Sequence, residues 1–194
     1  MFQNDAKGVV IAEGDILTLC IRLFSELLQT RYSLGSLLPD ASESLLAFHA
    51  SALLEENATL LQTFGSHRSE AFNALILPQS QPAVEAIGHA MAYSAATKAR
   101  LPQPILDLYE CAVIRQDPAW YSEHGISRME QRHREDVAVS AALPHLNTYL
   151  DSLHIENYVS APIVSDASWK TYVTSLPVFT GNAVPEMDQL RASL

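Results

Sequence analysis

The sequence has little cysteine and little glycine, and each scarcity excludes a class of protein. Cys20 and Cys111 are its two cysteines and lie far apart in the chain, which excludes a disulfide framework and indicates a reducing compartment. Both lie among apolar residues, which favours core packing over nucleophilic catalysis. The seven glycines form neither a dinucleotide-binding fingerprint nor a P-loop.

Positive charge and long apolar runs are scarce as well. Twelve Lys and Arg against 22 Asp and Glu give a formal charge of −10, which repels a phosphate backbone. The one basic cluster, Arg128, Arg132, His133 and Arg134, is interleaved with acidic residues and is typical of a solvated helix face, so no nucleic-acid binding is expected. No apolar stretch is long enough for a membrane span, and the start of the chain lacks the pattern of a signal peptide.

Apolar residues recur at helical spacing along most of the chain, and no strand pattern interrupts them. The sequence therefore predicts an all-α fold, with an antiparallel helical bundle as the simplest architecture. The expected helices cover 15–34, 40–64 between an Asp40/Glu43 capping box and Gly65, 70–77, a stretch from about 82 that is rich in small residues, 105–115, 127–150 and 166–176. Ser127 should cap the helix over 127–150, and Pro144 should kink or break it. The first has a broad apolar face and is expected to be largely buried.

Two short patterns carry candidate chemistry. Glu13-Gly14-Asp15 precedes the first helix; glycine lets a ligand come close, and an apolar cleft would raise the glutamate pKa toward that of a general base. The same residues also fit a turn followed by a helix N-cap. Glu130 and His133 match half of a di-iron Glu-x-x-His site, but the sequence holds no second copy, so no metal is expected.

A series of residues in 107–127 has a recognisable order and spacing. It consists of Leu108-Tyr109, Ile114, Asp117, Trp120-Tyr121, Glu123 and Ser127. This series resembles the acyl-CoA oxidase family, which carries a Leu-Tyr pair, an Ile before an Asp, then Trp-Phe, Glu and a helix-starting Ser. Pro144, Leu150-Asp151 and residues 166–172 are similar to later segments of that family. Glu13-Gly14-Asp15 matches three of the four positions of its Glu-Gly-Asp-Asn segment, with Ile16 in place of asparagine.

The resemblance implies a domain organisation and a reaction. Residues 1–35 would be the Glu-Gly-Asp segment and the last helix of a flavin-binding helical domain, 36–180 a C-terminal helical domain, and 181–194 a flexible tail. Glu13 would remove the α-proton of a fatty acyl-CoA beside FAD, which Gly14 and Asp15 would approach, and O2 would be reduced to H2O2 in fatty acid β-oxidation.

In that family, most of the FAD and acyl-CoA sites lie in preceding domains. The chain alone is therefore expected to be incomplete, and to need a homodimer or a partner chain carrying the flavin domains. A peroxisomal or cytoplasmic location is implied, and the C-terminal Ala192-Ser193-Leu194 is a near-match to a peroxisomal signal.

Two alternatives remain open. The chain could be a non-catalytic all-helical dimerisation or scaffold module derived from that family, with its apolar first helix covered by self-association. It could also be an unrelated helical bundle that binds a small apolar ligand.

Overall fold

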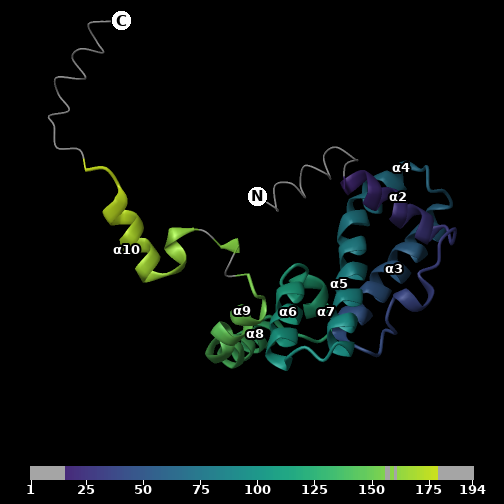
Figure 1. Cartoon of the computed structure of the whole chain (residues 1–194). Helices are drawn as coiled ribbons and strands as arrows, with labels where there is room; N and C mark the ends of the chain where they lie inside the picture. The colour runs from purple at the N-terminus through teal and green to yellow at the C-terminus, as the bar shows by residue number, and fades with distance from the viewer. Residues whose placement is uncertain (1–15, 156–157, 160, 179–194) are drawn as a thin grey trace, which may run out of the picture. The chain divides into compact units, whose positions relative to one another are not determined.

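The computed structural model describes residues 16–155, 158–159 and 161–178. These residues form helices and contain no strand, which confirms the predicted all-α class (Figure 1). The chain divides into two compact units, Met1–Pro144 and His145–Leu194, and each is described by itself. The predicted division after residue 35 stays a prediction. None of the described helices has the length and apolar character needed to cross a membrane.

The first unit is a set of packed helices. They are α2 (Ile16–Leu28), α3 (Leu45–Phe64), α4 (Glu70–Leu75), α5 (Ser80–Lys98), α6 (Gln103–Ile114), α7 (Pro118–Glu123) and α8 (Arg128–Ala142). Helix α5 packs against α2, α3 and α6, and α6 in turn packs against α8 (Figure 1). The small residues of α5 explain its many neighbours, because short side chains let helix backbones approach closely. Ala83, Ala86 and Ala90 are all buried there.

Short polar side chains start most of these helices. Ser44 caps α3 by accepting a hydrogen bond from the Ala47 backbone N–H at 3.1 Å. Ser69, Asp117 and Ser127 cap α4, α7 and α8 in the same way. Gly65 ends α3 in the left-handed conformation with φ of 69°, a position that favours glycine.

The predicted start of α3 at Asp40 is wrong. The reciprocal contact of a capping box does form, since Glu43 Oε1 accepts from the Asp40 backbone N–H at 3.2 Å. However, Asp40 Oδ1 accepts from both the backbone N–H and the hydroxyl of Ser42, at 2.9 and 2.6 Å. Its side chain therefore closes a turn, and the helix begins only after Ser44.

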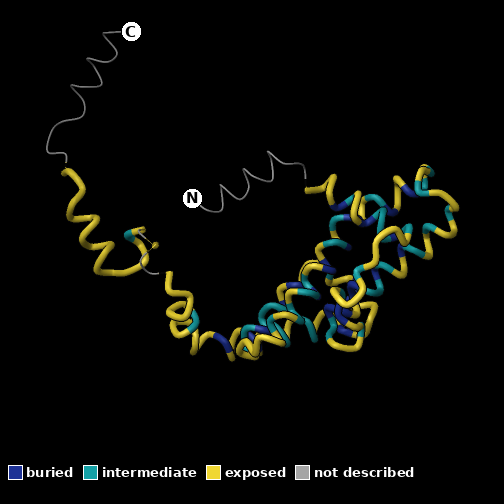
Figure 2. Tube along the Cα trace, turned by 45° about the vertical axis from the view of Figure 1, so that its right-hand side comes forward, coloured by how far each residue is buried: buried dark blue, intermediate teal, exposed yellow. Residues whose placement is uncertain are grey.

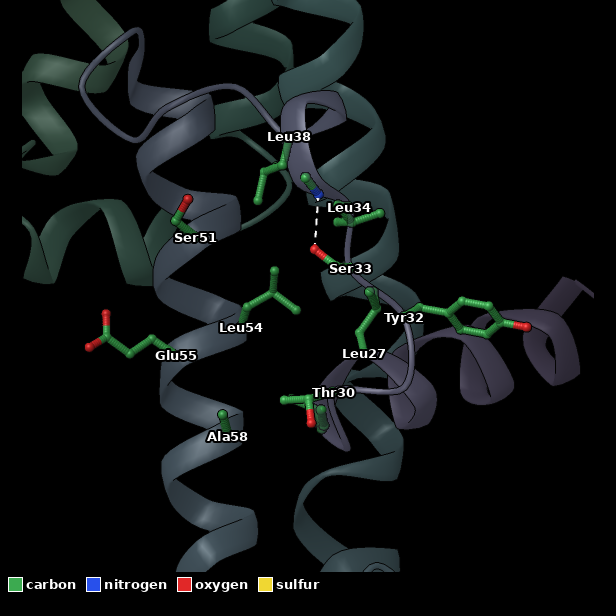
Figure 3. Close-up of a pocket in the computed structure, with 12 residues that line it drawn as sticks. Leu27, Thr30, Tyr32, Ser33, Leu34, Leu38, Ser51, Leu54, Glu55 and Ala58 are labelled. Atoms are coloured by element: carbon green, nitrogen blue, oxygen red, sulfur yellow. Dashed lines mark hydrogen bonds between the residues drawn. The ribbon is translucent and has the colours of Figure 1, made fainter.

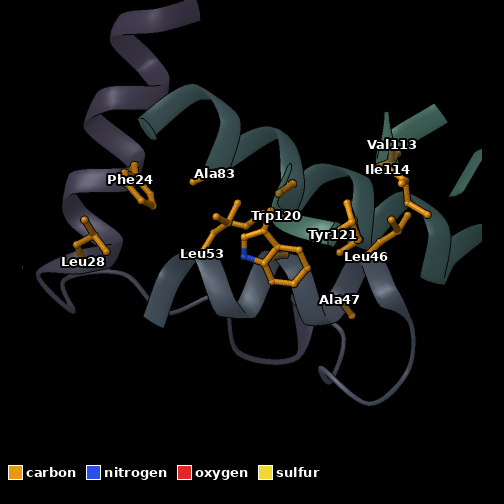
Figure 4. Packing of buried hydrophobic residues seen from close by; sticks show 14 of the residues in the cluster. Phe24, Leu28, Leu46, Ala47, Leu53, Ala83, Val113, Ile114, Trp120 and Tyr121 are labelled. Atoms are coloured by element: carbon orange, nitrogen blue, oxygen red, sulfur yellow. The ribbon is translucent and has the colours of Figure 1, made fainter. Parts of the chain in front are cut away.

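One hydrophobic cluster holds the first unit together. Side chains from α2, α3, α5, α6 and α7 meet in it (Figure 4). Its largest fully buried side chains are Phe24, Leu46, Ile76, Ile114 and Tyr121. The cluster joins residues from Phe24 on α2 to Ile126 after α7, so this segment folds around one shared core.

Helix α2 differs from the prediction in length and burial. It ends at Leu28 rather than near residue 34, and Thr30 follows with a positive φ of 58°. Only one side is buried, through Phe24 and Leu28, whereas Leu19 is 58% exposed. The expectation of a largely buried helix was wrong because α2 packs mainly against α5, which covers one side of it.

Pro144 interrupts the helical path, as predicted. Helix α8 ends at Ala142, Leu143–His145 form a 3₁₀ turn, and α9 (Leu146–Ser152) follows. A proline inside a helix removes a backbone donor and clashes with the preceding turn, which accounts for the break.

The second unit contains α9, a 3₁₀ turn at Pro162–Val164, and α10 (Asp166–Ser175). Ser165 caps α10, and the 3₁₀ turn packs against that helix. None of the described residues of this unit is buried, and Trp169 and Tyr172 of α10 are both exposed (Figure 2). These helices therefore bury little apolar surface in the described part of the chain.

Candidate functional site

The residues predicted to carry chemistry, Glu13, Gly14 and Asp15, lie outside the described residues. Their roles stay predictions. Helix α2, which follows them, is described from Ile16 onward, so the structure shows which of its side chains are exposed next to that segment.

The exposed side of α2 carries apolar residues beside Thr18 and Arg22. Ile16 is 47% exposed, Leu19 58% and Leu23 37%. These residues follow one another at helical spacing of three and four, so they form one stripe, which we call the α2 stripe. Scattered exposed leucines are common on protein surfaces, but an unbroken stripe along a helix is typical of a surface that another chain segment covers.

Two residues that carry the resemblance, Asp117 and Trp120, connect α7 to α3. Asp117 Oδ1 accepts from the Trp120 backbone N–H at 3.2 Å, and Asp117 Oδ2 lies 3.3 Å from Nε2 of His49 on α3. The Trp120 indole N–H donates to Glu56 Oε1 at 3.2 Å. These contacts tie the short helix α7 to α3 in two places.

His49 is a buried ionisable group of this cluster, at 5% exposure. Burial lowers its pKa, and the nearby Asp117 carboxylate only partly opposes that effect. The ring is therefore neutral near pH 7. A neutral ring that donates from Nε2 to Asp117 leaves Nδ1 as an acceptor, and no partner for Nδ1 is found in the described part of the chain.

Tyr121 lies against His49 with ring centroids 4.9 Å apart, and it is completely buried. Burial raises the pKa of its phenol, so the hydroxyl stays protonated. This hydroxyl also lacks a hydrogen-bond partner among the described residues. Two buried polar atoms of the cluster are thus unpaired within the described ranges, which costs stability.

Aromatic rings complete the cluster. The His124 ring stacks on Trp120 with centroids 3.7 Å apart and an interplanar angle of 14°. Phe48 lies 5.4 Å from Trp120. In the described part of the chain, no hydroxyl or thiol is hydrogen-bonded to His49, so the His49–Asp117 pair activates no nucleophile there. We interpret the pair as a polar contact that fixes α7 on α3.

A hollow of about 540 Å³ lies between the end of α2, the loop after it, and α3 (Figure 3). Leu27, Leu38 and Leu54 point into it, and Glu55 is its one ionisable carboxylate. The hollow is open, and its lining is mainly apolar. It suits an apolar group and offers no arrangement for acid–base chemistry.

The contacts of Cys111 and of the candidate metal motif within the described residues are structural. Burial, followed by the charge of Glu110, raises the pKa of the Cys111 thiol, and Cys20 is also buried. Glu130 Oε1 accepts from Arg134 Nε at 3.0 Å. Within the described ranges, no three His, Cys, Asp or Glu side chains gather as metal ligands would.

Comparisons with protein-family models, with curated proteins and with solved structures found no match to this chain.

Proposed function

We propose that this chain is the C-terminal helical part of an FAD-dependent acyl-CoA oxidase, acting in fatty acid β-oxidation. The observation that supports this most is the α2 stripe, which begins directly after Glu13-Gly14-Asp15. In the family that the sequence resembles, the matching helix is the last of the flavin-binding domain. A helix in that position needs one apolar side for its own chain and a second for the flavin domain.

The residues behind the resemblance also have definite places in the fold. Asp117 and Ser127 are the N-caps of α7 and α8, and Trp120 and Tyr121 fill the core beneath them. Their spacing therefore corresponds to a short helix, a turn and a long helix. This arrangement is consistent with a helical bundle like the C-terminal domain of the family.

In the proposed reaction this chain supplies the base. Glu13 would take the α-proton of a fatty acyl-CoA, while bound FAD would supply the acceptor for the β-hydride. Gly14 and Asp15 would border the cofactor. The described glycines, Gly35, Gly65, Gly88 and Gly125, lie in separate turns and helices and form no phosphate-cradling loop. Most contacts to FAD would therefore come from flavin domains on a partner chain or from a second copy.

A second candidate is a non-catalytic dimerisation or scaffold module. It is favoured by the contacts of Asp117, Trp120 and Ser127, all of which serve packing and capping. The α2 stripe would then be covered by a second copy of the chain.

Flavin binding separates the two candidates. The purified chain, with and without added FAD, is passed through a sizing column with absorbance and light-scattering detection. The oxidase proposal predicts flavin absorbance that elutes with the protein once a second copy, or an added chain that carries the flavin domains, completes the site. That absorbance should bleach when a long-chain acyl-CoA is added without oxygen. Glu13→Gln should retain the flavin and lose the bleaching.

Glu70→Gln is the matched control, because Glu70 is an exposed carboxylate in the first turn of α4. It should bleach like the unmodified chain. Equal bleaching by Glu13→Gln would remove Glu13 as the base. A colourless protein with the mass of a dimer, converted to a monomer by Leu19→Lys, would favour the dimerisation module.

A further inference from the structure

A second hollow, of about 710 Å³, lies between α6, α7 and α8. Its lining comes from the end of α6, from α7 and from the first two turns of α8. Ile114 and Cys111 are buried against it, and much of its surface is apolar, but six of its other lining residues end in polar groups. Its volume is in the range of cavities that hold small molecules of nucleotide size.

Three arginines line this hollow against one carboxylate. They are Arg115 after α6 and Arg128 and Arg132 on α8, and the carboxylate is Glu135. Arg115 donates to Glu135 at 2.7 Å. Arg128 and Arg132 form no ion pair in the described part of the chain. Within the part of the chain that the structure describes, these two positive charges therefore have no ion-pair partner, although the formal charge of the protein is −10.

The helix geometry brings these two charges to one place. Arg128 and Arg132 are four residues apart and so share one face of α8. Arg134 lies on another side of the helix, where it forms ion pairs with Glu110 at 3.7 Å and Glu130 at 3.0 Å. The basic cluster that looks like one solvated face in the sequence is therefore divided, and only one part of it is neutralised.

The wall of the hollow is held in place by hydrogen bonds. The Gln131 side-chain amide donates to the Pro118 and Ile126 carbonyls, at 3.0 and 2.9 Å, and to the Ser122 hydroxyl at 3.1 Å. Ser122 itself donates to the Pro118 carbonyl at 2.8 Å. Because Gln131 lies between the two free arginines, these bonds fix the turn of α8 that carries them against α7. A fixed turn lowers the ordering cost of binding.

We propose that this hollow binds a phosphate-bearing small molecule through Arg115, Arg128 and Arg132. A planar guanidinium donates two parallel hydrogen bonds to phosphate oxygens, so arginines from two helices can hold one phosphate group from two sides. An extended polyanion such as a nucleic acid does not suit the site, because the acidic remainder of the chain repels it. The site would bind phosphate whether or not the chain belongs to an oxidase.

Isothermal titration at an ionic strength of about 0.1 M, where the Debye length is about 10 Å, tests the proposal, with inorganic phosphate and ADP as the two probes. The unmodified chain should bind ADP, and inorganic phosphate more weakly. Each Arg→Gln change should weaken ADP binding about tenfold, so Arg128→Gln/Arg132→Gln should lose about a hundredfold. Arg68→Gln/Lys98→Gln is the matched control, because it removes the same charge from exposed positions outside the hollow.

The control should bind ADP within about twofold of the unmodified chain, since distant surface charges are screened. Circular dichroism should show that both double variants keep the helical fold. Equal weakening in the two double variants would mean that ADP senses only the overall charge, and the proposal would be overturned. Absence of ADP binding by the unmodified chain at millimolar concentration would overturn it as well.

Discussion

The two faces of α2 should respond differently to the same loss of side-chain volume. Phe24 is fully buried in the main cluster, whereas Leu19, on the same helix, is 58% exposed. Truncating a buried Phe to Ala typically costs about 3–5 kcal/mol, from lost burial and from the cavity that remains. Truncating Leu19 removes less than half of a buried side chain, so Leu19→Ala should cost about 1 kcal/mol or less.

Urea unfolding followed by far-ultraviolet circular dichroism measures this difference. With a denaturant dependence of about 2 kcal/mol per molar urea, Phe24→Ala should lower the midpoint by roughly 2 M and Leu19→Ala by less than about 0.5 M. A small domain has only about 5–15 kcal/mol of stability, so Phe24→Ala can unfold the chain outright. Phe24→Leu, which keeps most of the volume, then gives a measurable intermediate loss of about 1–1.5 kcal/mol.

Equal midpoints for Phe24→Ala and Leu19→Ala would refute the reasoning. They would mean that α2 does not pack its Phe24 side on the rest of the first unit. The α2 stripe would then no longer be the outward side of a docked helix, and the main support for the proposed function would be lost.

Two further predictions concern the cluster between α3 and α7. Burial lowers the pKa of His49 in the folded chain, so the unfolded chain binds the proton more readily. The stability that the neutral His49 ring contributes is therefore present above the unfolded-state pKa of about 6.5 and is lost as pH falls below it. His49→Gln should therefore show a smaller drop in urea midpoint between pH 7.5 and pH 5.5 than the unmodified chain; an unchanged drop would assign the pH dependence to other groups. Asp117→Ala removes both the N-cap of α7 and the partner of His49, and should lower stability by about 1–2 kcal/mol in the same assay. Asp117→Asn can still cap the helix and should lose less, and similar losses in both variants would show that the cap contributes little.

Helix boundaries could be predicted where one residue decides them locally. Gly65, Pro144 and Ser127 each act through their own backbone or side chain, and the structure confirms all three. The start of α3 could not be predicted in this way, because Asp40 and Ser44 both carry capping side chains. The choice between them depends on the hydrogen bonds that Ser42 makes to Asp40, which the capping pattern does not include.

Burial depth and long-range contacts were harder to predict. The periodicity of α2 identifies a helix with a broad apolar face, but how much of that face is covered depends on which helices reach it. The contact between His49 and Asp117 joins residues on α3 and at the start of α7, and no local pattern signals it. Only the position of His49 in an apolar stretch of α3, flanked by Phe48 and Ala50, gives a hint of a buried ring.

The residues that carry the family resemblance differ in what constrains them. Asp117, Trp120 and Ser127 serve caps and packing, so the fold requires them whether or not the chain takes part in catalysis. Glu13 is different, because the proposed reaction requires a carboxylate there, whereas a turn before α2 does not. Glu13→Gln should therefore lose acyl-CoA-dependent bleaching while it retains the flavin and the helical fold. This result would support a catalytic role for Glu13, because a purely structural role predicts no such selective loss.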